Sequence, residues 1–261
     1  MPALPESTPT AAPAAGESAS PGRISAIIPA LNEQEFIGRT VQAVRAIAGV
    51  TETIVVDGGS KDLTVECARE AGAQVLAALR GRGSQMAAGA LRATGSALWF
   101  IHADTVPPVD GGRLIIQALA DPQVVGGHFR PRFEGNFRAA RFLTWLYPKL
   151  SLLGLKYGDA SLFVRATDYH QVGGFQSYPL FEDLDLLRRL QKRGRMVQLS
   201  AEVLTSSRRF DGRSFGLTFA AWTALQLLYW AGVSPHRLAR WYPHLRSPGR
   251  KKPAGHASAG R

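Results

Sequence analysis

The strongest constraint on the fold is an alternation of short apolar runs with longer helical patterns in the first half of the chain. The apolar runs are Ile24–Pro29, Thr53–Val56, Gln74–Ala77 and Ala97–Ile101, and the helical patterns cover about Glu33–Ile47, Leu63–Ala71 and Ser84–Ala93. Such an alternation predicts βαβ units and a parallel sheet. Helices cover both faces of a parallel sheet, so its buried strands need no polar alternation.

The pattern is less regular after Asp121. We expect strands at Val124–Phe133, Asp159–Arg165 and Met196–Val203, and a helix at Phe181–Lys192; Ala139–Leu153 is aromatic and apolar. A composition of 45% hydrophobic and 20% charged residues excludes a disordered, fibrous or polytopic membrane protein. The single cysteine, Cys67, excludes an intramolecular disulfide framework and a cysteine zinc cluster.

The net charge of +11 is typical of a protein with a nucleic-acid, anionic-lipid or phosphorylated partner, but it is unevenly spread. Residues 205–261 hold ten Lys and Arg and one acid, so the rest of the chain is nearly neutral. We expect a disordered leader at 1–22, which lacks the apolar and basic regions of a signal peptide. An α/β domain at 23–204, a helical segment at 205–246 and a disordered basic tail at 247–261 follow.

Polar clusters follow three of the predicted strands: Asn32-Glu33, Asp57 and Asp104. In open α/β sheets, ligands bind beyond these carboxyl ends. Asp57, in VVDGGSKDLT, has two interpretations. It forms a turn or caps a helix, or it accepts a hydrogen bond from the N–H of a nucleobase such as uracil, which the glycines after it would allow to approach closely. Asp104 is either a cap or a ligand for a hard divalent cation that bridges phosphates.

Three further groups each have two interpretations. The Arg80–Gln85 segment, with Arg82, precedes a helix and forms either an anion site or a solvated loop. It matches neither the Walker pattern nor G-x-G-x-x-G, so neither motif supports an ATPase or a dehydrogenase. Glu182 and Asp183 suit a helix start through the helix dipole alone. A carboxylate at a helix start, such as Asp183, can also supply a general base. His102 is a metal ligand, an orienting group or a histidine satisfied by its neighbours.

Taken in order, these segments resemble family 2 glycosyltransferases with the GT-A fold. The motifs are IPALNE (28–33), VVDGGSKDLT (55–64), HAD (102–104), GGF followed by FEDLDL (173–186) and SSRRF (206–210), and the resemblance covers about residues 23–245. GRGSQM, FIHADT and GVSP are similar to a subgroup in which some members are named 4,4'-diaponeurosporenoate glycosyltransferase. The resemblance implies a Rossmann-like, mostly parallel sheet with a C-terminal apolar and basic helical extension.

The resemblance also implies a role for each matching residue. It places Pro29, Asn32 and Glu33 in the nucleotide pocket and Asp57 on the nucleobase. Asp104 matches the last Asp of D-x-D and would bind Mg²⁺ or Mn²⁺, and Asp183 matches the catalytic base. Arg208 and Arg209 would lie near the diphosphate. Two departures stand out: His102 replaces the first Asp of D-x-D, and the Gln and Trp of Q-x-x-R-W are missing. The second departure suggests a non-processive enzyme that adds one sugar.

The implied activity is inverting transfer from a nucleotide-sugar donor to a lipophilic acceptor, such as a carotenoid acid. A nucleotidyltransferase, which releases pyrophosphate, and a non-catalytic membrane-associated scaffold remain alternatives.

The charge-free stretch 214–235 bears on where such an enzyme works. As a helix, Phe215–Ala231 would be about 25 Å long, short of the ~30 Å of a membrane core. A membrane span would place the basic residues that follow it on the side of the membrane opposite the catalytic domain. The sugar nucleotide is cytoplasmic, so these residues would then lie outside, against the positive-inside tendency. An interfacial helix on anionic lipid at the cytoplasmic face fits better, with packing on the domain as the alternative. A nucleic-acid partner is not predicted, because the aromatics lie in an apolar run.

Overall fold

The computed structural model describes residues 22–133, 161–206 and 215–241, and the side chains of Phe133 and of residues 215–219 are not described. The expected leader, the apolar segment 139–153 and the basic tail lie outside these residues. The first half forms the predicted alternation: β1 (Ile24–Ala30), α1 (Ile37–Arg45), β2 (Val50–Asp57), α2 (Thr64–Glu70), β3 (Gln74–Ala77), α3 (Arg82–Arg92) and β4 (Ala97–Phe100).

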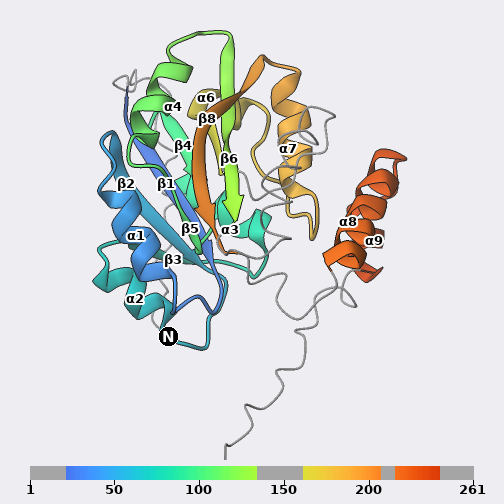
Figure 1. Cartoon of the computed structure of the whole chain (residues 1–261), viewed down its shortest axis with the longest axis horizontal. Coiled ribbons are helices and arrows are strands. Elements are labelled where there is room, and N and C mark those ends of the chain that lie inside the picture. Colours follow the sequence, from blue (N-terminus) through green and yellow to red (C-terminus); the bar gives the residue numbers. More distant parts are fainter. Residues whose placement is uncertain (1–21, 134–160, 207–214, 242–261) are drawn as a thin grey trace, which may run out of the picture.

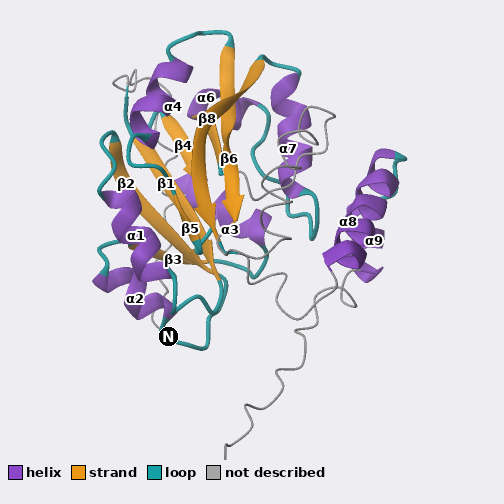
Figure 2. Ribbon diagram, viewed as in Figure 1, coloured by secondary structure: helices purple, strands orange, loops and turns teal. Residues whose placement is uncertain are grey.

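The next described elements along the chain add four more strands, which complete one eight-stranded sheet, and three helices. They are β5 (Thr105–Val106), α4 (Gly111–Leu119), β6 (Val124–Phe133), β7 (Leu162–Arg165), α6 (Ala166–Gln171), α7 (Glu182–Gln191) and β8 (Arg195–Thr205). The strand order is β3-β2-β1-β4-β7-β6-β8-β5. Figure 2 shows the strands in orange, with helices around them. Strands β3, β2, β1 and β4 are parallel, β7 runs antiparallel between β4 and β6, and β6 pairs in parallel with β8. This confirms the α/β class and the mostly parallel sheet.

Helices cover both faces of this sheet, as expected (Figure 1). Side chains of α1, α2 and α4 pack on one face, where Ile28 of β1 and Trp99 of β4 are buried. Side chains of α3, α6 and α7 pack on the other face, where Ile27 and Phe100 are buried. Neighbouring residues of β1 and β4 thus enter opposite cores, which explains why these strands are apolar without alternation.

Elements α4, β5 and α6 were not expected from the sequence. Helix α4 begins with two glycines, which are poor helix formers. Close packing explains them: a Cβ at Gly112 would lie 2.0 Å from the carbonyl oxygen of Ala48, and one at Gly111 would lie 2.8 Å from the Trp99 ring. Strand β5 has two residues, too few for a periodic pattern.

Two helices, α8 (Phe215–Trp230) and α9 (Pro235–Trp241), form a C-terminal hairpin beside α7 (Figure 1). Aromatic contacts place it there: the ring of Tyr229 stacks on Phe181, with centroids 5.0 Å apart, and His236 meets Tyr178 edge-on at 5.9 Å. Within the described ranges, no helix has the length and apolarity that a membrane span requires.

Candidate active site

The loops that follow β1 and β2 are joined by hydrogen bonds. Asn32, which has a left-handed backbone with φ of 55°, donates its N–H to Ser60 Oγ at 2.9 Å, and its Oδ1 accepts from the Lys61 N–H at 2.8 Å. The Glu33 N–H donates to Thr64 Oγ1 at 2.7 Å. The ends of the IPALNE and VVDGGSKDLT motifs are therefore tied to each other at one edge of the sheet. Asn32 and Glu33 make part of this connection.

Asp57 ends β2 and organises the turn that follows. Its buried carboxylate accepts hydrogen bonds from the Gly59 N–H at 2.9 Å and from the backbone and hydroxyl of Ser60. The turn-forming interpretation of Asp57 is thus realised. An ionised carboxylate can accept more hydrogen bonds than these.

A buried amide on α3 ties the same two strands together. Gln85 is 4% exposed, and its Nε2 donates to the carbonyl oxygens of Ala30 and Val56, at 2.8 and 2.7 Å. Gly58 leaves room for this amide, because a Cβ there would lie 3.0 to 3.1 Å from its atoms. Gln85 therefore fixes the spacing of the two strand ends that precede Asn32 and Asp57. Sequence reasoning missed this role, although the residue stands in the singled-out RGRGSQ segment.

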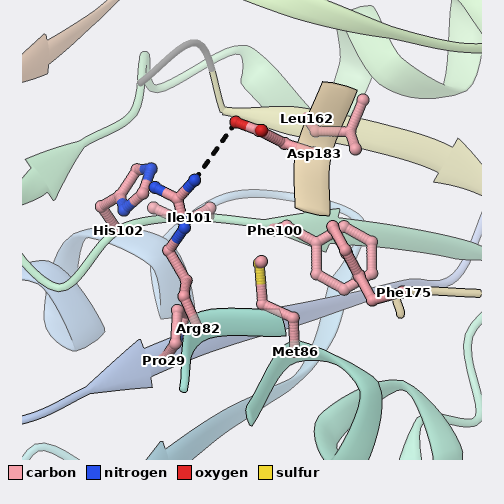
Figure 3. A pocket seen from close by; sticks show the side chains of 9 residues that line it. All are labelled: Pro29, Arg82, Met86, Phe100, Ile101, His102, Leu162, Phe175 and Asp183. Atoms are coloured by element: carbon pink, nitrogen blue, oxygen red, sulfur yellow. Dashed lines mark hydrogen bonds and ion pairs between the residues drawn. The ribbon is translucent and has the colours of Figure 1, made fainter. Parts of the chain in front are cut away.

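A pocket opens beside this edge and brings four of the predicted residues together (Figure 3). Arg82, His102 and Asp183 supply its polar groups, and Pro29 of β1 lies next to them. The rest of the lining is apolar: Met86, Phe100, Ile101, Leu162 and Phe175. A few convergent polar groups over an apolar floor are typical of a small-molecule site.

Arg82, the first residue of α3, faces the acids at the start of α7. Its Nε donates to Glu182, and its NH2 group lies 3.2 Å from Asp183 Oδ2 (Figure 3). Glu182 is 4% exposed, so a buried carboxylate orients this guanidinium. Asp183 Oδ1 accepts from the Leu184 N–H at 2.8 Å. The predicted helix start and anion loop are thus in contact, and Glu182 is a second residue that sequence reasoning left out of the site.

The GGF motif places an aromatic ring in the pocket wall. Gly173 and Gly174 have φ of 78° and 58°, which glycine adopts without strain, and a Cβ at Gly174 would lie 2.8 Å from Tyr169. Phe175 then packs edge-on against Phe100, with centroids 4.8 Å apart, and its N–H donates to the Tyr169 hydroxyl at 3.0 Å. Burial raises the pKa of the Tyr169 phenol to about 12, so this acceptor stays neutral at physiological pH.

The turn after β4 carries His102 and Asp104. His102 lines the pocket next to Arg82, and the Asp104 carbonyl accepts from the Ser206 N–H at 3.3 Å. Arg208 and Arg209 lie outside the described residues. Strand β8 nevertheless brings the start of their segment, Ser206, to Asp104. Among the described residues, no three or more His, Cys, Asp and Glu form a group that could hold a metal ion by themselves.

The geometry thus gathers Pro29, Arg82, His102 and Asp183 around one pocket and puts Asn32, Glu33 and Asp57 in the neighbouring loops. This sheet, with its polar residues beyond the strand ends, defines a protein of the GT-A glycosyltransferase type. Residues 25–184 match the model of the family described as glycosyl transferase family 2, which is more than half of the chain. The chain therefore belongs to family 2 of the glycosyltransferases.

Curated relatives match over part of their length. Glucosyl-3-phosphoglycerate synthase of Mycolicibacterium smegmatis is 36% identical over 104 residues, which are 35% of this chain and 34% of the relative. Undecaprenyl-phosphate 4-deoxy-4-formamido-L-arabinose transferase of Sodalis glossinidius is 31% identical over 163 residues, 57% of this chain and 49% of the relative. The chain thus spans between a third and a half of these proteins.

Solved structures confirm the fold. Glucosyl-3-phosphoglycerate synthase of M. tuberculosis has a TM-score of 0.52 at 20% identity, over 69% of this chain and 72% of that one. Its complex with phosphoglyceric acid has the same TM-score and identity and covers 76% of this chain and 78% of that one. At this identity the likeness concerns the arrangement of the sheet and helices.

Proposed function

We propose that this protein transfers one sugar from a nucleotide-sugar donor to a lipophilic acceptor, with inversion at the anomeric carbon. The observation that carries the proposal is the convergence of Arg82, His102 and Asp183 on one pocket at the carboxyl edge of the sheet. A guanidinium suits the charge that develops on a departing diphosphate. A carboxylate at the start of a helix suits a general base.

In the proposed reaction, an acceptor oxygen forms a bond to the anomeric carbon while the bond from that carbon to the diphosphate breaks. The proton of a hydroxyl acceptor passes to Asp183, and the electron pair of the broken bond leaves with the nucleoside diphosphate. Glu182 holds Arg82, and Arg82 in turn holds Asp183, so the base has a defined orientation. A carboxylic acid acceptor is already ionised at pH 7, and Asp183 would then position it without taking a proton.

A divalent cation fits the residues after β4. We propose that His102 and Asp104 would hold Mg²⁺ or Mn²⁺, with the remaining ligands from the donor's diphosphate and water, since Mg²⁺ sites often use one or two protein carboxylates and substrate phosphates. The cation would supply charge stabilisation of the diphosphate. A structural neighbour from Mycobacterium tuberculosis was crystallised with Mn²⁺, UDP-glucose and phosphoglyceric acid, which makes Mn²⁺ and UDP-glucose the first pair to test.

The proposed acceptor is lipophilic, and a carotenoid acid such as 4,4'-diaponeurosporenoate is the specific candidate because of the GRGSQM, FIHADT and GVSP segments. The name of one relative, an undecaprenyl-phosphate transferase, also supports a lipid acceptor. We further propose that the protein works at the cytoplasmic face of the cell membrane, on which its C-terminal hairpin lies.

A screen of sugar nucleotides, with and without Mn²⁺, tests this function. We expect Mn²⁺-dependent release of free nucleoside diphosphate, and mass analysis of extracted lipids should show one added hexose. Release of pyrophosphate would indicate a nucleotidyltransferase. Failure to bind UDP with Mn²⁺ would favour a non-catalytic scaffold.

Asp183→Asn tests the base. With a hydroxyl acceptor we expect turnover to fall by about 10²-fold or more, because general base catalysis typically contributes that much. UDP affinity, measured by calorimetry, should stay within about threefold of the wild type, because the loops after β1 and β2 are held by their own hydrogen bonds. Retained turnover of a hydroxyl acceptor would remove Asp183 from this role.

A further inference from the structure

The C-terminal hairpin contacts the residue that immediately precedes the two acids of the candidate active site. Tyr229 of α8 stacks on Phe181, with ring centroids 5.0 Å apart and planes inclined by 24°. The guanidinium of Arg188, on α7, lies 5.3 Å from the Tyr229 ring centroid. Tyr229 is thus held by both the residue before α7 and a residue on α7, and Glu182 and Asp183 lie between these two contacts in sequence.

Phe181 has a backbone conformation that such a residue rarely adopts. Its φ is 63° and its ψ 21°, the left-handed region that glycine tolerates and bulky side chains avoid. A conformation of this kind persists only where the surrounding structure holds it. Phe181 also accepts the first hydrogen bond of α7, from the Asp185 N–H at 3.0 Å. A change in the Phe181 backbone would therefore alter the turn that carries Asp183.

We propose that Tyr229 is a positioning residue of the active site: its stack on Phe181 holds the left-handed turn that orients Asp183, and so couples the C-terminal hairpin to the catalytic carboxylate. The role of Asp183 in this statement rests on the proposed function. The coupling itself is a property of the fold. A segment that we place at the lipid surface thereby bears on the geometry of the site.

Hydrogen exchange at the first turn of α7 tests the coupling without any substrate. In Tyr229→Ala we expect the Leu184 and Asp185 amides to exchange about tenfold faster than in the wild type, because an aromatic pair and a cation–π contact are lost. Tyr229→Phe keeps the ring and loses only the hydroxyl with its hydrogen bond to Arg188, so its exchange should stay much closer to the wild type than that of Tyr229→Ala. Amides of α3 should be unchanged in both variants.

A double-mutant cycle makes the test specific to the stack. Phe181→Gly removes the ring but keeps a residue for which positive φ is unstrained. Tyr229→Ala should then cause a much smaller increase in exchange when it is added to Phe181→Gly, because only the Arg188 contact remains to be lost. Equal effects of Tyr229→Ala in both backgrounds, or unchanged exchange in Tyr229→Ala, would overturn the proposal.

Turnover gives a second readout. With UDP-glucose and Mn²⁺ as the probe and water as the acceptor, we expect Tyr229→Ala to lower kcat about tenfold and to leave UDP affinity unchanged. Glu52→Gln, which weakens the opposite edge of the sheet, is the control for general destabilisation and should keep the wild-type kcat. Wild-type turnover in Tyr229→Ala would overturn the coupling to Asp183. A wild-type protein without UDP binding or turnover would instead count against the proposed function, while the exchange result would stand independently.

Discussion

At the scale of single residues, Gln85 shows how a side chain outside the acidic motifs can shape the site that we propose for the nucleotide. Its amide donates to Ala30 and Val56, the residues just before the two loops that we assign to the nucleotide. In Gln85→Met the shape is kept and the donor is lost. We expect the free energy of unfolding to fall by about 1–2 kcal/mol and UDP affinity to fall about tenfold.

Calorimetry with UDP and with pyrophosphate would separate these effects. Because Gln85 supports the loop that carries Asp57, the loss should be larger for UDP than for pyrophosphate, which has no base. Glu52→Gln serves again as the destabilised control and should bind UDP normally. Equal losses for both ligands would mean that Gln85 does not act on the base side of the pocket.

The polar residues after the strand ends show what a sequence can and cannot predict about single residues. The strand-end positions of Asn32, Asp57 and Asp104 follow from pattern alone, since parallel strands end at one edge. Their long-range partners do not, because Ser60 meets Asn32, and Ser206 meets Asp104, only in the folded chain. For the same reason the pairing of Arg82 with residues a hundred positions away could not be predicted.

At the scale of elements, Glu52 joins three strands at the amino edge of the sheet. Its carboxylate on β2 accepts from Ser25 Oγ of β1 and from the Thr94 N–H, at 2.6 Å, in the turn before β4. Burial would raise the pKa of the Glu52 carboxyl, but these hydrogen bonds together hold it below its usual value of 4.5. A carboxyl whose pKa is lower in the folded protein than in the unfolded chain stabilises the fold at pH values above the unfolded-state pKa. This stabilisation is lost as the pH falls through the folded-state pKa.

Glu52→Gln should therefore destabilise the protein by about 1 kcal/mol near pH 7, a modest effect because the group is partly exposed. The difference from the wild type should shrink in acid, as the pH falls through the lowered pKa of the Glu52 carboxyl and the carboxyl becomes protonated. Urea unfolding at pH 7, 5 and 3.5 measures it. A difference that grows toward acid would contradict this account.

The contact between α3 and α7 depends on Gly83. A Cβ there would lie 2.6 Å from the Gln176 carbonyl oxygen and 3.2 Å from Glu182 Cβ, so Gly83→Ala should push α3 away from α7. We expect a loss of about 1–3 kcal/mol in the free energy of unfolding and reduced turnover, since Arg82 would shift from Asp183. Gly38→Ala in α1, where the nearest atom is 3.9 Å away, is the matched control and should stabilise by about 0.5–1 kcal/mol. Thermal unfolding that shows the same change for both variants would contradict the close approach.

Strands β3 and β6 have the predicted bounds, and α7 begins one residue later than expected. Helix α1 begins at Ile37, four residues after the expected start, because the chain first turns through the left-handed Asn32 and a short bend. The pairing of β8 between β6 and β5 depends on contacts that no local pattern encodes.

At the scale of the whole molecule, the charge distribution predicts where the protein binds. Residues 205–261 carry nearly all of the excess positive charge, next to apolar side chains such as Leu227 and Trp241, which are 53% and 57% exposed. We expect the full-length protein to sediment with vesicles that contain anionic lipid and to dissociate in high salt. Binding to zwitterionic vesicles should be weak. Equal binding to both, insensitive to salt, would contradict an electrostatic surface attachment.

The strand order also has a consequence for how the chain folds. Strands β1 to β4 all lie within the first hundred residues, although β4 pairs with β1 across about seventy of them. By contrast, β6 reaches the sheet only through β7, and β8 pairs with β6 across about seventy further residues. Closing such long loops is slow, and pairing of distant strands limits folding rates. During synthesis the half that contains β1 to β4 can therefore assemble first, with the edge of β4 open until residues 162–165 emerge. The half that contains β6, β7 and β8, and with it the completed pocket, is the last part of the domain to form.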